Sequence, residues 1–322
     1  MKKFLSLLLT FALLLGIGAP VYAADGGSDG SSSEAGLREE AIVKTLEALD
    51  EPLYKDTYAA LLNGESIRKG SYGEAARGVQ QTLVDFGQRI GVDGSVGGLT
   101  ISALNAVQEA FGLEQTDALD ATGYGELLEC LRLYRDPEAW LTMLDETDSR
   151  LLYLAGCARA LRGEYFQAQE CFRMTDYADA EKRADDCKQP WPSNGVIWQA
   201  PHLSSEMNLC FDIKQSEDTG MFIKIYKGGT ELVATLFVGG TGSASLWLPG
   251  GTYSIKDASG GDWYGSGDAF GPMGSYEIMT FDGGSSLVSL DAGYIYTITV
   301  NAEDSSPDAD SVGSLDTSYE DF

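Results

Sequence analysis

Two amphipathic helical patterns joined by a glycine-rich turn constrain the fold of this chain more than any other stretch. From Glu74, apolar residues recur at spacings of three and four, and the same period returns after the turn. This period predicts two helices that each bury one face. The turn between them contains Asp93-Gly94 and Gly97-Gly98. Because glycine takes left-handed backbone angles without a steric cost, we expect Gly94 and Gly97 both to adopt them.

Short motifs follow one another through this stretch in a characteristic order. They are Gly70, Gly73, Val79-Gln80, Asp93-Gly94, Val96-Gly97, Thr100, Ala103 and Val107-Gln108. The series resembles the small three-helix peptidoglycan-binding domain of bacterial cell-wall proteins. That family has a Gly-x-x-Gly lead-in, a Leu-Gln pair, an Asp-Gly-x-Phe-Gly turn and a Thr-x-x-Ala helix ending in Phe-Gln. Valine replaces a larger apolar residue at positions 79, 96 and 107, and Asp120-Ala121 stands where the family usually has a further Asp-Gly. The resemblance implies that the core still forms while the groove between the helices differs.

The resemblance also implies a ligand, peptidoglycan, held in a groove with polar side chains at its rim. The matching polar positions are Gln80, Asp93, Thr100 and Gln108. Two of them have a structural alternative, since Thr100 can cap its own helix and Asp93 can shape the turn.

The first residues predict export. Lys2 and Lys3 precede an apolar run over 4–15, and Val-Tyr-Ala at 21–23 fits a small-x-small cleavage site. This is the pattern of a secretory signal peptide over residues 1–23, cleaved after Ala23. No cysteine follows the run and no later stretch is long and apolar enough to cross a bilayer, so we expect no membrane anchor after cleavage. The expected location is secreted, or held in the cell wall of a Gram-positive bacterium.

The remaining chain divides by composition and period. Residues 24–36 are rich in Gly, Ser and Asp and predict a flexible linker, and residues 37–135 form the helical domain that contains the motifs. The predicted β-sandwich is assigned to 189–302, which opens with a breaker-rich linker at 189–195 and continues with strand-like patterns. The last stretch, 303–322, is acidic and is predicted to be disordered.

Residues 136–188 continue with helical spacing. Gly156, Tyr165, Ala168 and Phe172 fall at the close-packing, turn, small and core positions of a helical hairpin. The spacing resembles a tetratricopeptide-like segment. Such repeats normally need about three copies to bury their faces, and one is visible here. A helical spacer and a peptide-binding groove both stay open.

A period of two marks the strands of the carboxyl-terminal part. The patterns lie at 209–213, 222–226, 232–238, 244–248, 252–255, 276–281, 287–290 and 295–300. Short strands of this kind predict an antiparallel β-sandwich. The run Leu-Pro-Gly-Gly-Thr-Tyr from Leu248 resembles a corner of carboxypeptidase-regulatory-like sandwiches. The predicted fold class is therefore multidomain α + β, with an all-α amino-terminal part and an antiparallel β-sandwich.

Trp263, Tyr264 and Phe270 lie in a loop rich in Gly and Asp, at 259–274. Rings exposed there would contact a carbohydrate or a partner protein, whereas the alternative is that they close the open end of the sandwich. The carboxylates of this region are Asp257, Asp262 and Asp268. They are oxygen ligands of the kind that calcium prefers, but their spacing matches no calcium loop, so we predict no metal site.

A shortage of histidine argues against wall-hydrolysing enzymes. His202 is the single histidine, and it lies next to a proline. Zinc peptidases need two or three histidines, and thiol peptidases pair a cysteine with one. A glycosidase needs only two carboxylates, yet no segment is left over for a glycosidase domain. We predict a non-enzyme with no catalytic residue and no cofactor.

The chain has five cysteines, an odd number for an exported protein. Cys157 and Cys171 lie on opposite arms of the predicted hairpin. A disulfide between them and buried core thiols are both open alternatives.

The net charge of the chain limits the classes of partner that it can bind. With 22 basic against 49 acidic residues the formal net charge is −27, which excludes nucleic acid and an anionic membrane surface as partners. The hypothesis is an exported, non-catalytic protein that binds peptidoglycan through its helical module. Its sandwich would face another wall carbohydrate or a surface protein. The alternative is a secreted structural or adaptor protein whose helical modules bind protein.

Overall fold

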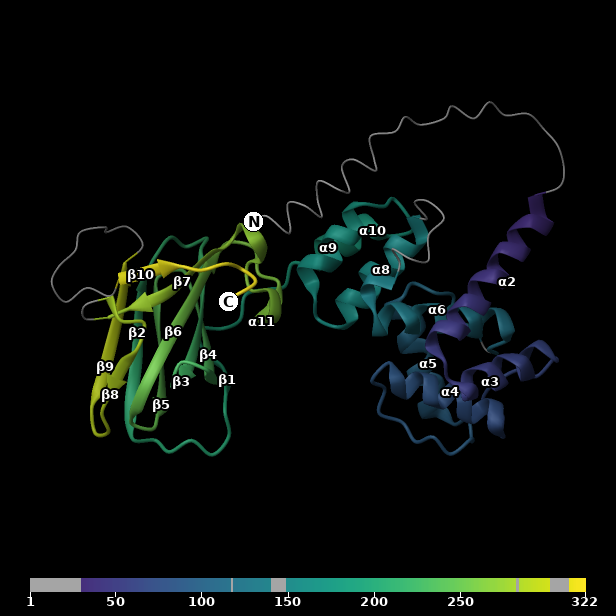
Figure 1. Ribbon diagram of the computed structural model, residues 1–322, viewed down its shortest axis with the longest axis horizontal. Coiled ribbons are helices and arrows are strands. Elements are labelled where there is room, and N and C mark those ends of the chain that lie inside the picture. Colours follow the sequence, from purple (N-terminus) through teal and green to yellow (C-terminus); the bar gives the residue numbers. More distant parts are fainter. Residues whose placement is uncertain (1–29, 117, 140–148, 282–283, 302–312) are drawn as a thin grey trace, which may run out of the picture. The chain divides into compact units, whose positions relative to one another are not determined.

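The structure, a computed structural model, describes residues 30–116, 118–139, 149–281, 284–301 and 313–322. Residues Lys44–Phe322 form one compact unit, separate from the residues before it. Helices occupy its amino-terminal part and strands its carboxyl-terminal part (Figure 1), so the predicted α + β class is confirmed. The predicted signal peptide and the linker up to residue 29 lie outside the described ranges. No helix within those ranges has both the length and the apolar character needed to cross a bilayer.

Most helices follow the predicted periodicity, but α2 begins at Gly30, so the prediction of a flexible linker is wrong for residues 30–36. They are α2 (Gly30–Leu49), α3 (Pro52–Leu62), α4 (Glu74–Asp85), α5 (Gly98–Ala110), α6 (Ala121–Arg135), η1 (Pro137–Ala139), α8 (Ser149–Leu161), α9 (Tyr165–Arg173) and α10 (Ala180–Asp186). Val79 and Leu83 of α4, Phe111 after α5 and Leu127 of α6 are fully buried, as one apolar face per helix requires. Asp120 caps α6, because its carboxylate accepts a hydrogen bond from the backbone N–H of Gly123 at 2.9 Å.

The helices α8 and α9 form a close-packed hairpin. A Cβ on Gly156 would stand 2.7 Å from the ring of Phe172, so Gly156 lies at a close-packed position, as predicted. Arg183 of α10 donates to the backbone oxygens of Ala110 at 2.7 Å and Glu109 at 3.1 Å. Both carbonyls lie in the last turn of α5, where backbone oxygens lack the usual partner four residues on, so the contact ties α10 to α5.

The strands belong to two sheets (Figure 1). They are β1 (Gly195–Gln199), β2 (Met207–Lys214), β3 (Gly220–Lys227), β4 (Glu231–Gly239), β5 (Gly242–Leu248), β6 (Gly251–Gly260), β7 (Ser275–Thr280), β8 (Val288–Leu290), β9 (Ile295–Asn301) and β10 (Gly313–Asp316), with α11 (Gly265–Asp268) and η2 (Gly271–Met273) after β6. The large sheet has the order β1-β4-β3-β6-β7-β10, with β8 also paired to β6, and the small sheet has the order β5-β2-β9.

The pairing is antiparallel except between β2 and β9, which run parallel. The prediction of a purely antiparallel arrangement is wrong at this pair. A period of two reports which face of a strand is buried, not the direction of its neighbour. One apolar cluster contains residues of both sheets, among them Phe211 of β2, Leu246 of β5 and Ile223 of β3.

The carboxyl-terminal residues are part of the fold. β10 pairs with β7 from Gly313 to Asp316, and Tyr319 and Phe322 pack against an aromatic cluster on the large sheet. Lys224 donates to the backbone oxygen of Phe322 at 3.1 Å. The predicted disorder is therefore wrong for residues 313–322, because two aromatic anchors outweigh the acidic composition on which it rested. Residues 303–312 lie outside the described ranges.

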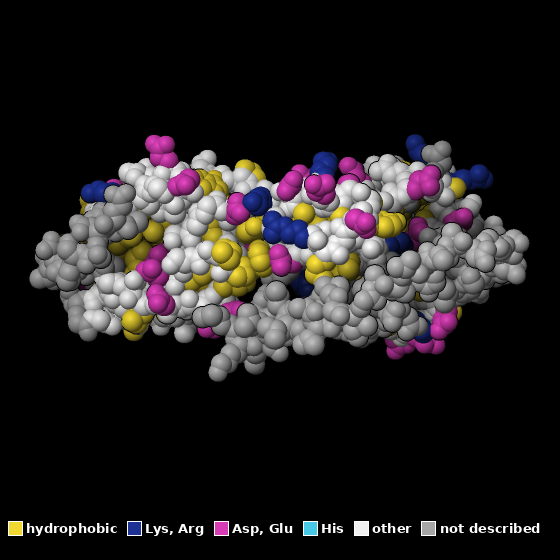
Figure 2. Space-filling model, turned by 90° about the horizontal axis from the view of Figure 1, so that it is seen from above, with side chains coloured by type: hydrophobic (Ala, Val, Ile, Leu, Met, Phe, Trp, Pro, Cys, Tyr) yellow, Lys and Arg dark blue, Asp and Glu magenta, His cyan; other side chains and the backbone are white. Residues whose placement is uncertain are grey.

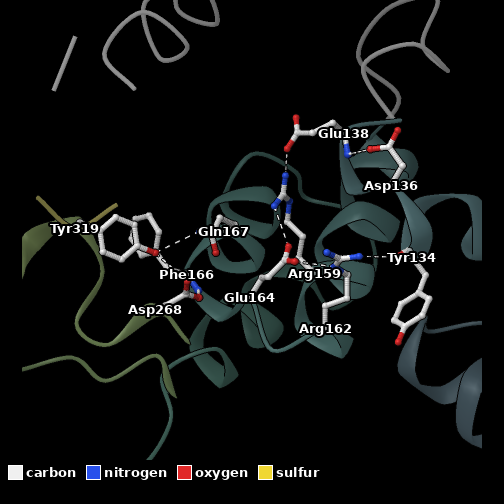
Figure 3. Close-up of polar contacts among 10 residues, drawn as sticks. All are labelled: Tyr134, Asp136, Glu138, Arg159, Arg162, Glu164, Phe166, Gln167, Asp268 and Tyr319. Atoms are coloured by element: carbon white, nitrogen blue, oxygen red, sulfur yellow. Dashed lines mark hydrogen bonds and ion pairs between the residues drawn. The ribbon is translucent and has the colours of Figure 1, made fainter. Parts of the chain in front are cut away.

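Contacts also join the hairpin to the strand region, as Figure 3 shows around Asp268. The two carboxylate oxygens of Asp268 accept hydrogen bonds from the backbone N–H of Phe166 at 2.9 Å and the hydroxyl of Tyr319 at 2.8 Å. Asp268 thus caps the start of α9 from another part of the chain.

The predicted linker at 189–195 is not a free spacer. Gln189 donates through its backbone N–H to the oxygen of Trp263 at 2.8 Å, and the indole N–H of Trp191 donates to the oxygen of Gly261 at 2.9 Å. The two prolines led to the prediction of a linker. The structure differs because the Trp191 ring between them packs on Phe237.

Candidate functional site

The turn between α4 and α5 folds back on the residues that lead into α4. Gly70 donates to the oxygen of Val96 and Val96 donates to the oxygen of Ser71, both at 2.9 Å, and Gly73 donates to the oxygen of Gly94 at 3.0 Å. Tyr72 and Ser95 face each other in this short ladder. The glycine-rich motifs at 70–73 and 94–97 therefore form one local structure.

The side chain of Gln80 holds this structure from inside. Its amide nitrogen donates to Asp93 Oδ1 at 2.9 Å, to the backbone oxygen of Ser95 at 3.0 Å and to Thr100 Oγ1 at 3.3 Å. Its amide oxygen accepts from the backbone N–H of Gly94 at 2.7 Å. Gln80 is 1% exposed. A buried amide that is satisfied on both sides stabilises one conformation of the turn.

Asp93 lies at the surface end of this network. Its Oδ1 also accepts from the backbone N–H of Ser95 at 2.8 Å, the geometry by which aspartate shapes a turn. The hydrogen bond from Gln80, and next the one from Ser95, lower the pKa of Asp93 below its usual value. Asp93 is thus an exposed carboxylate held in one orientation.

The backbone angles require a glycine at only one of the two positions, Gly94 and Gly97, that were predicted to be left-handed. Gly94 has φ +77°, and a Cβ there would stand 3.0 Å from the oxygen of Gly73. Gly97 has φ −96° with no atom near its Cβ position, so the prediction that it needs a left-handed angle is wrong. Gly97 is the N-cap residue of α5, a position at which an extended angle suffices.

The structure brings three of the four predicted ligand residues together, but not as the rim of a groove. Gln80 and Thr100 are buried in the network beneath Asp93. Gln108 is buried in α5, and its amide oxygen has no hydrogen-bond partner among the described residues. The prediction of an accessible polar rim is therefore wrong for Gln80, Thr100 and Gln108. Side-chain spacing did not reveal that the amides point inward.

Two residues missed by the motif comparison are the most exposed large apolar side chains near the turn. Tyr72 is 82% exposed and Leu99 is 77% exposed. Both adjoin glycines, Tyr72 before Gly73 and Leu99 after Gly98. Because a glycine neighbour has no side chain with which to cover an adjacent apolar residue, this flanking was the available signal. A rigid turn thus presents a phenol ring, an isobutyl group and one carboxylate.

The predicted aromatic contact site is not at the surface. Trp263, Tyr264 and Phe270 are 3–5% exposed. The Trp263 ring lies with its centroid 5.1 Å from that of Phe222 and 5.2 Å from that of Phe237. The prediction that these rings contact a ligand is wrong, because they pack against the large sheet, where the Trp263 ring meets Phe222 of β3 and Phe237 of β4, earlier in the chain.

The remaining predicted candidates lie apart from one another. Asp257 is buried on β6, Asp262 pairs with Lys188 at 2.8 Å and Asp268 caps α9. Within the described residues, no three His, Cys, Asp or Glu side chains gather closely enough to hold a metal ion. His202 is exposed in its loop.

The cysteines carry free thiols, and none is paired in a disulfide. Burial raises the pKa of Cys157 to about 12 and that of Cys171 to about 11. Both stay protonated near neutral pH and behave as small apolar core residues. The possible disulfide between them is absent from the described structure.

A cleft of about 300 Å³ lies among the helices. Its lining residues are Glu109, Ala160, Tyr165, Phe172, Asp179, Lys182, Arg183, Asp186 and Cys187. Four of its five charged residues pair with one another, Arg183 with Asp179 at 2.9 Å and Lys182 with Asp186 at 3.9 Å, and Glu109 is the fifth. This cleft offers no convergent group for a ligand, so the turn is the stronger candidate site.

No family model, no curated protein and no solved structure matches this chain, so its function has to be argued from its own residues.

Proposed function

We propose that this chain is an exported, non-catalytic cell-wall protein that binds peptidoglycan through its helical module. The motif series from Gly70 to Gln108 resembles peptidoglycan-binding domains, and the three helices α4, α5 and α6 would form the bundle of that family. The two sheets would form a β-sandwich that displays an interaction surface. The shared apolar cluster of both sheets supports this second part.

The observation that carries the proposal is the rigid turn. The buried Gln80 amide fixes the backbone from Gly94 to Ser95, and Tyr72 and Leu99 stand exposed beside it. A fixed backbone lowers the entropy cost of binding. A phenol ring can cover the C–H face of a sugar and also donate a hydrogen bond.

The net charge of the expected mature chain limits how it could be held at a cell wall. Loss of Lys2 and Lys3 with the expected signal peptide leaves 20 basic against 49 acidic residues, a net charge of 20 − 49 = −29. Figure 2 shows acidic side chains dispersed over the visible face. Attraction to anionic wall polymers cannot retain such a protein. Retention would come from short-range contacts at the turn.

The alternative function is that of a secreted structural or adaptor protein whose helical module binds protein. One observation favours it, namely that Gln80, Thr100 and Gln108 are buried and leave a mainly apolar surface at Tyr72 and Leu99. Surfaces of this composition also suit protein partners.

A pull-down of the mature protein on purified peptidoglycan freed of teichoic acid separates the two. The double variant Tyr72→Ala, Leu99→Ala should lose binding by about tenfold or more, equal to ~1.4 kcal/mol. Leu62→Ala is the matched control, since Leu62 is 60% exposed on α3 and should leave binding unchanged. Failure of the unaltered protein to bind would exclude peptidoglycan and leave the adaptor function.

A further inference from the structure

The small sheet has an outer face that no other element of the described chain covers. Strand β2 alternates buried residues with half-buried ones from Met207 to Ile213. In β5 and β9 the outward residues of the alternation are exposed. The pairing register places the outward residues in three rows across β5, β2 and β9. We call this the small-sheet face, and its rows are Trp247-Asn208-Ile295, Ser245-Cys210-Thr297 and Ser243-Asp212-Thr299.

Two large apolar side chains of the small-sheet face are exposed. Trp247 is 52% exposed and Ile295 is 72% exposed, whereas Leu246 and Leu248, the chain neighbours of Trp247, are buried in the core. The tryptophan is therefore not a core residue displaced to the surface. It stands on a strand whose inner side is already filled.

The centre of the face is held in place. The Asn208 amide donates to the backbone oxygen of Leu246 at 3.2 Å, and the Cys210 thiol donates to Asn208 Oδ1 at 2.9 Å. The side chain of Gln199 on β1 donates to the backbone oxygen of Trp247 at 2.8 Å, which fixes the strand at the position of the ring. A face whose central side chains are held by hydrogen bonds is a preformed surface.

The chemistry of the face is that of a sugar-binding surface. An indole ring offers an apolar face, and a pyranose offers a matching patch of C–H groups edged by hydroxyls. The hydroxyls of Ser243, Ser245, Thr297 and Thr299 can both donate and accept hydrogen bonds. Neighbouring strands lie ~4.8 Å apart and successive outward residues ~6.8 Å apart, so the face measures about 10 Å by 14 Å. Such a surface accommodates more than one sugar ring.

Charge selects among glycans. Asp212 and, one row further along β2, Lys214 are the charged residues on this side of the small sheet, so their charges cancel, and the chain as a whole carries a net charge of −27. An acidic polysaccharide would be repelled by this protein. A glycan chain without charge meets no such barrier.

We propose that the small-sheet face binds an uncharged glycan chain, with the Trp247 ring stacked on one pyranose and the serine and threonine hydroxyls bonded to its neighbours. This site is separate from the turn between α4 and α5. It does not depend on whether the helical module binds peptidoglycan.

The test is calorimetric titration of the full mature protein with two soluble, uncharged probes, the hexamer of N-acetylglucosamine and cellohexaose. At least one probe should bind, and Trp247→Ala should weaken that binding by about tenfold or more. Trp198→Ala is the matched control, because Trp198 is 45% exposed but lies on β1 of the large sheet. It should change binding by less than about twofold. Circular dichroism of both variants checks that each is folded.

Three results would overturn the proposal: no binding of either hexamer, equal loss in the two tryptophan variants, or equally tight binding of an anionic polysaccharide such as polygalacturonate. Neither hexamer carries a stem peptide, and the Tyr72→Ala, Leu99→Ala variant should bind them normally. Failure at the small-sheet face is therefore distinguishable from failure at the turn.

Discussion

At the residue scale, the turn depends on one amide and one glycine. Gln80 reaches from α4 to three different parts of the turn, and Gly94 supplies the backbone angle that lets its N–H meet that amide. A side chain at Gly94 would be strained in φ and close to the oxygen of Gly73. The two glycines of the motif are therefore unequal.

Replacing each glycine by alanine tests this difference. Gly94→Ala should lower the free energy of unfolding by about 1–3 kcal/mol, because its left-handed angle is poor for other residues. Gly97→Ala should change it by less than about 0.5 kcal/mol, since an extended angle with open space tolerates a methyl group. Urea denaturation followed by circular dichroism measures both. Equal losses would contradict the role given to Gly94.

A second residue-scale feature is a buried carboxyl group on the large sheet that faces a half-buried one. Asp257 of β6 is directly opposite Glu277 of β7 and is 7% exposed. Burial first, and the negative charge of Glu277 second, raise the pKa of Asp257 from 3.8 to about 7. The folded state therefore holds this proton more tightly than the unfolded chain does.

The sign of the pH dependence follows from this shift. The folded state binds more protons than the unfolded state between about pH 4 and pH 7, so stability falls as the pH rises through that window. Asn cannot ionise, so Asp257→Asn should be more stable than the natural chain at pH 8, by up to about 4 kcal/mol. At pH 4 the two should differ little.

Urea denaturation at the two pH values measures this effect. Asp291→Asn serves as the control, because Asp291 is exposed and should show no such difference. A variant that gains nothing at pH 8 would mean that Asp257 ionises in the fold at little cost.

At the scale of elements, the segment between α10 and β1 acts as part of the strand region. The Trp191 indole donates to Gly261 and its ring packs on Phe237. Asn194 accepts from the backbone N–H of Gly239 at 2.8 Å. Several independent contacts over so short a stretch oppose local opening.

Limited proteolysis with subtilisin tests this arrangement. The segment 188–195 should resist cleavage in the natural chain, and Trp191→Ala should be cut there at least about tenfold faster, since cleavage of a native protein tracks local opening. Trp198→Ala is the control: it also removes a tryptophan, but one on the edge strand β1 outside this segment, so the segment should be cut as slowly as in the natural chain. Rapid release of a β fragment from the natural chain would mean that residues 189–195 are a free linker after all.

At the scale of the whole molecule, charge governs how the protein meets a cell wall. The expected mature chain carries −29 (20 basic minus 49 acidic residues), and teichoic acids carry the same sign. Exposed charges are screened beyond about 8 Å at physiological ionic strength. Salt therefore weakens a repulsion and leaves the short-range contacts of the turn nearly untouched.

Binding measured against sodium chloride should reflect this. Association with intact walls should strengthen or stay level as salt rises, and association with purified peptidoglycan should not change. Sedimentation of walls with bound protein, between about 50 and 500 mM salt, gives both curves. A steep fall with salt would indicate attraction to a cationic partner instead.

Local patterns are enough to predict most elements of this fold. The helices from α3 to α9 follow from apolar residues spaced by three and four, and β2 to β9 follow from alternation. Both periods are set by the geometry of a single element. The division into a helical part and a strand part therefore follows from local periodicity.

Only the tertiary structure decided which side chains reach the surface. Gln80 and Trp263 are buried because other segments lie over them, while Trp247 is exposed because its sheet has an uncovered side. The parallel pairing of β2 with β9 and the docking of β10 on β7 likewise join strands distant in the chain. The sequence alone determined where most helices and strands form, because periodicity is local. The tertiary structure determined which residues are left to bind, because burial depends on elements far apart in the chain.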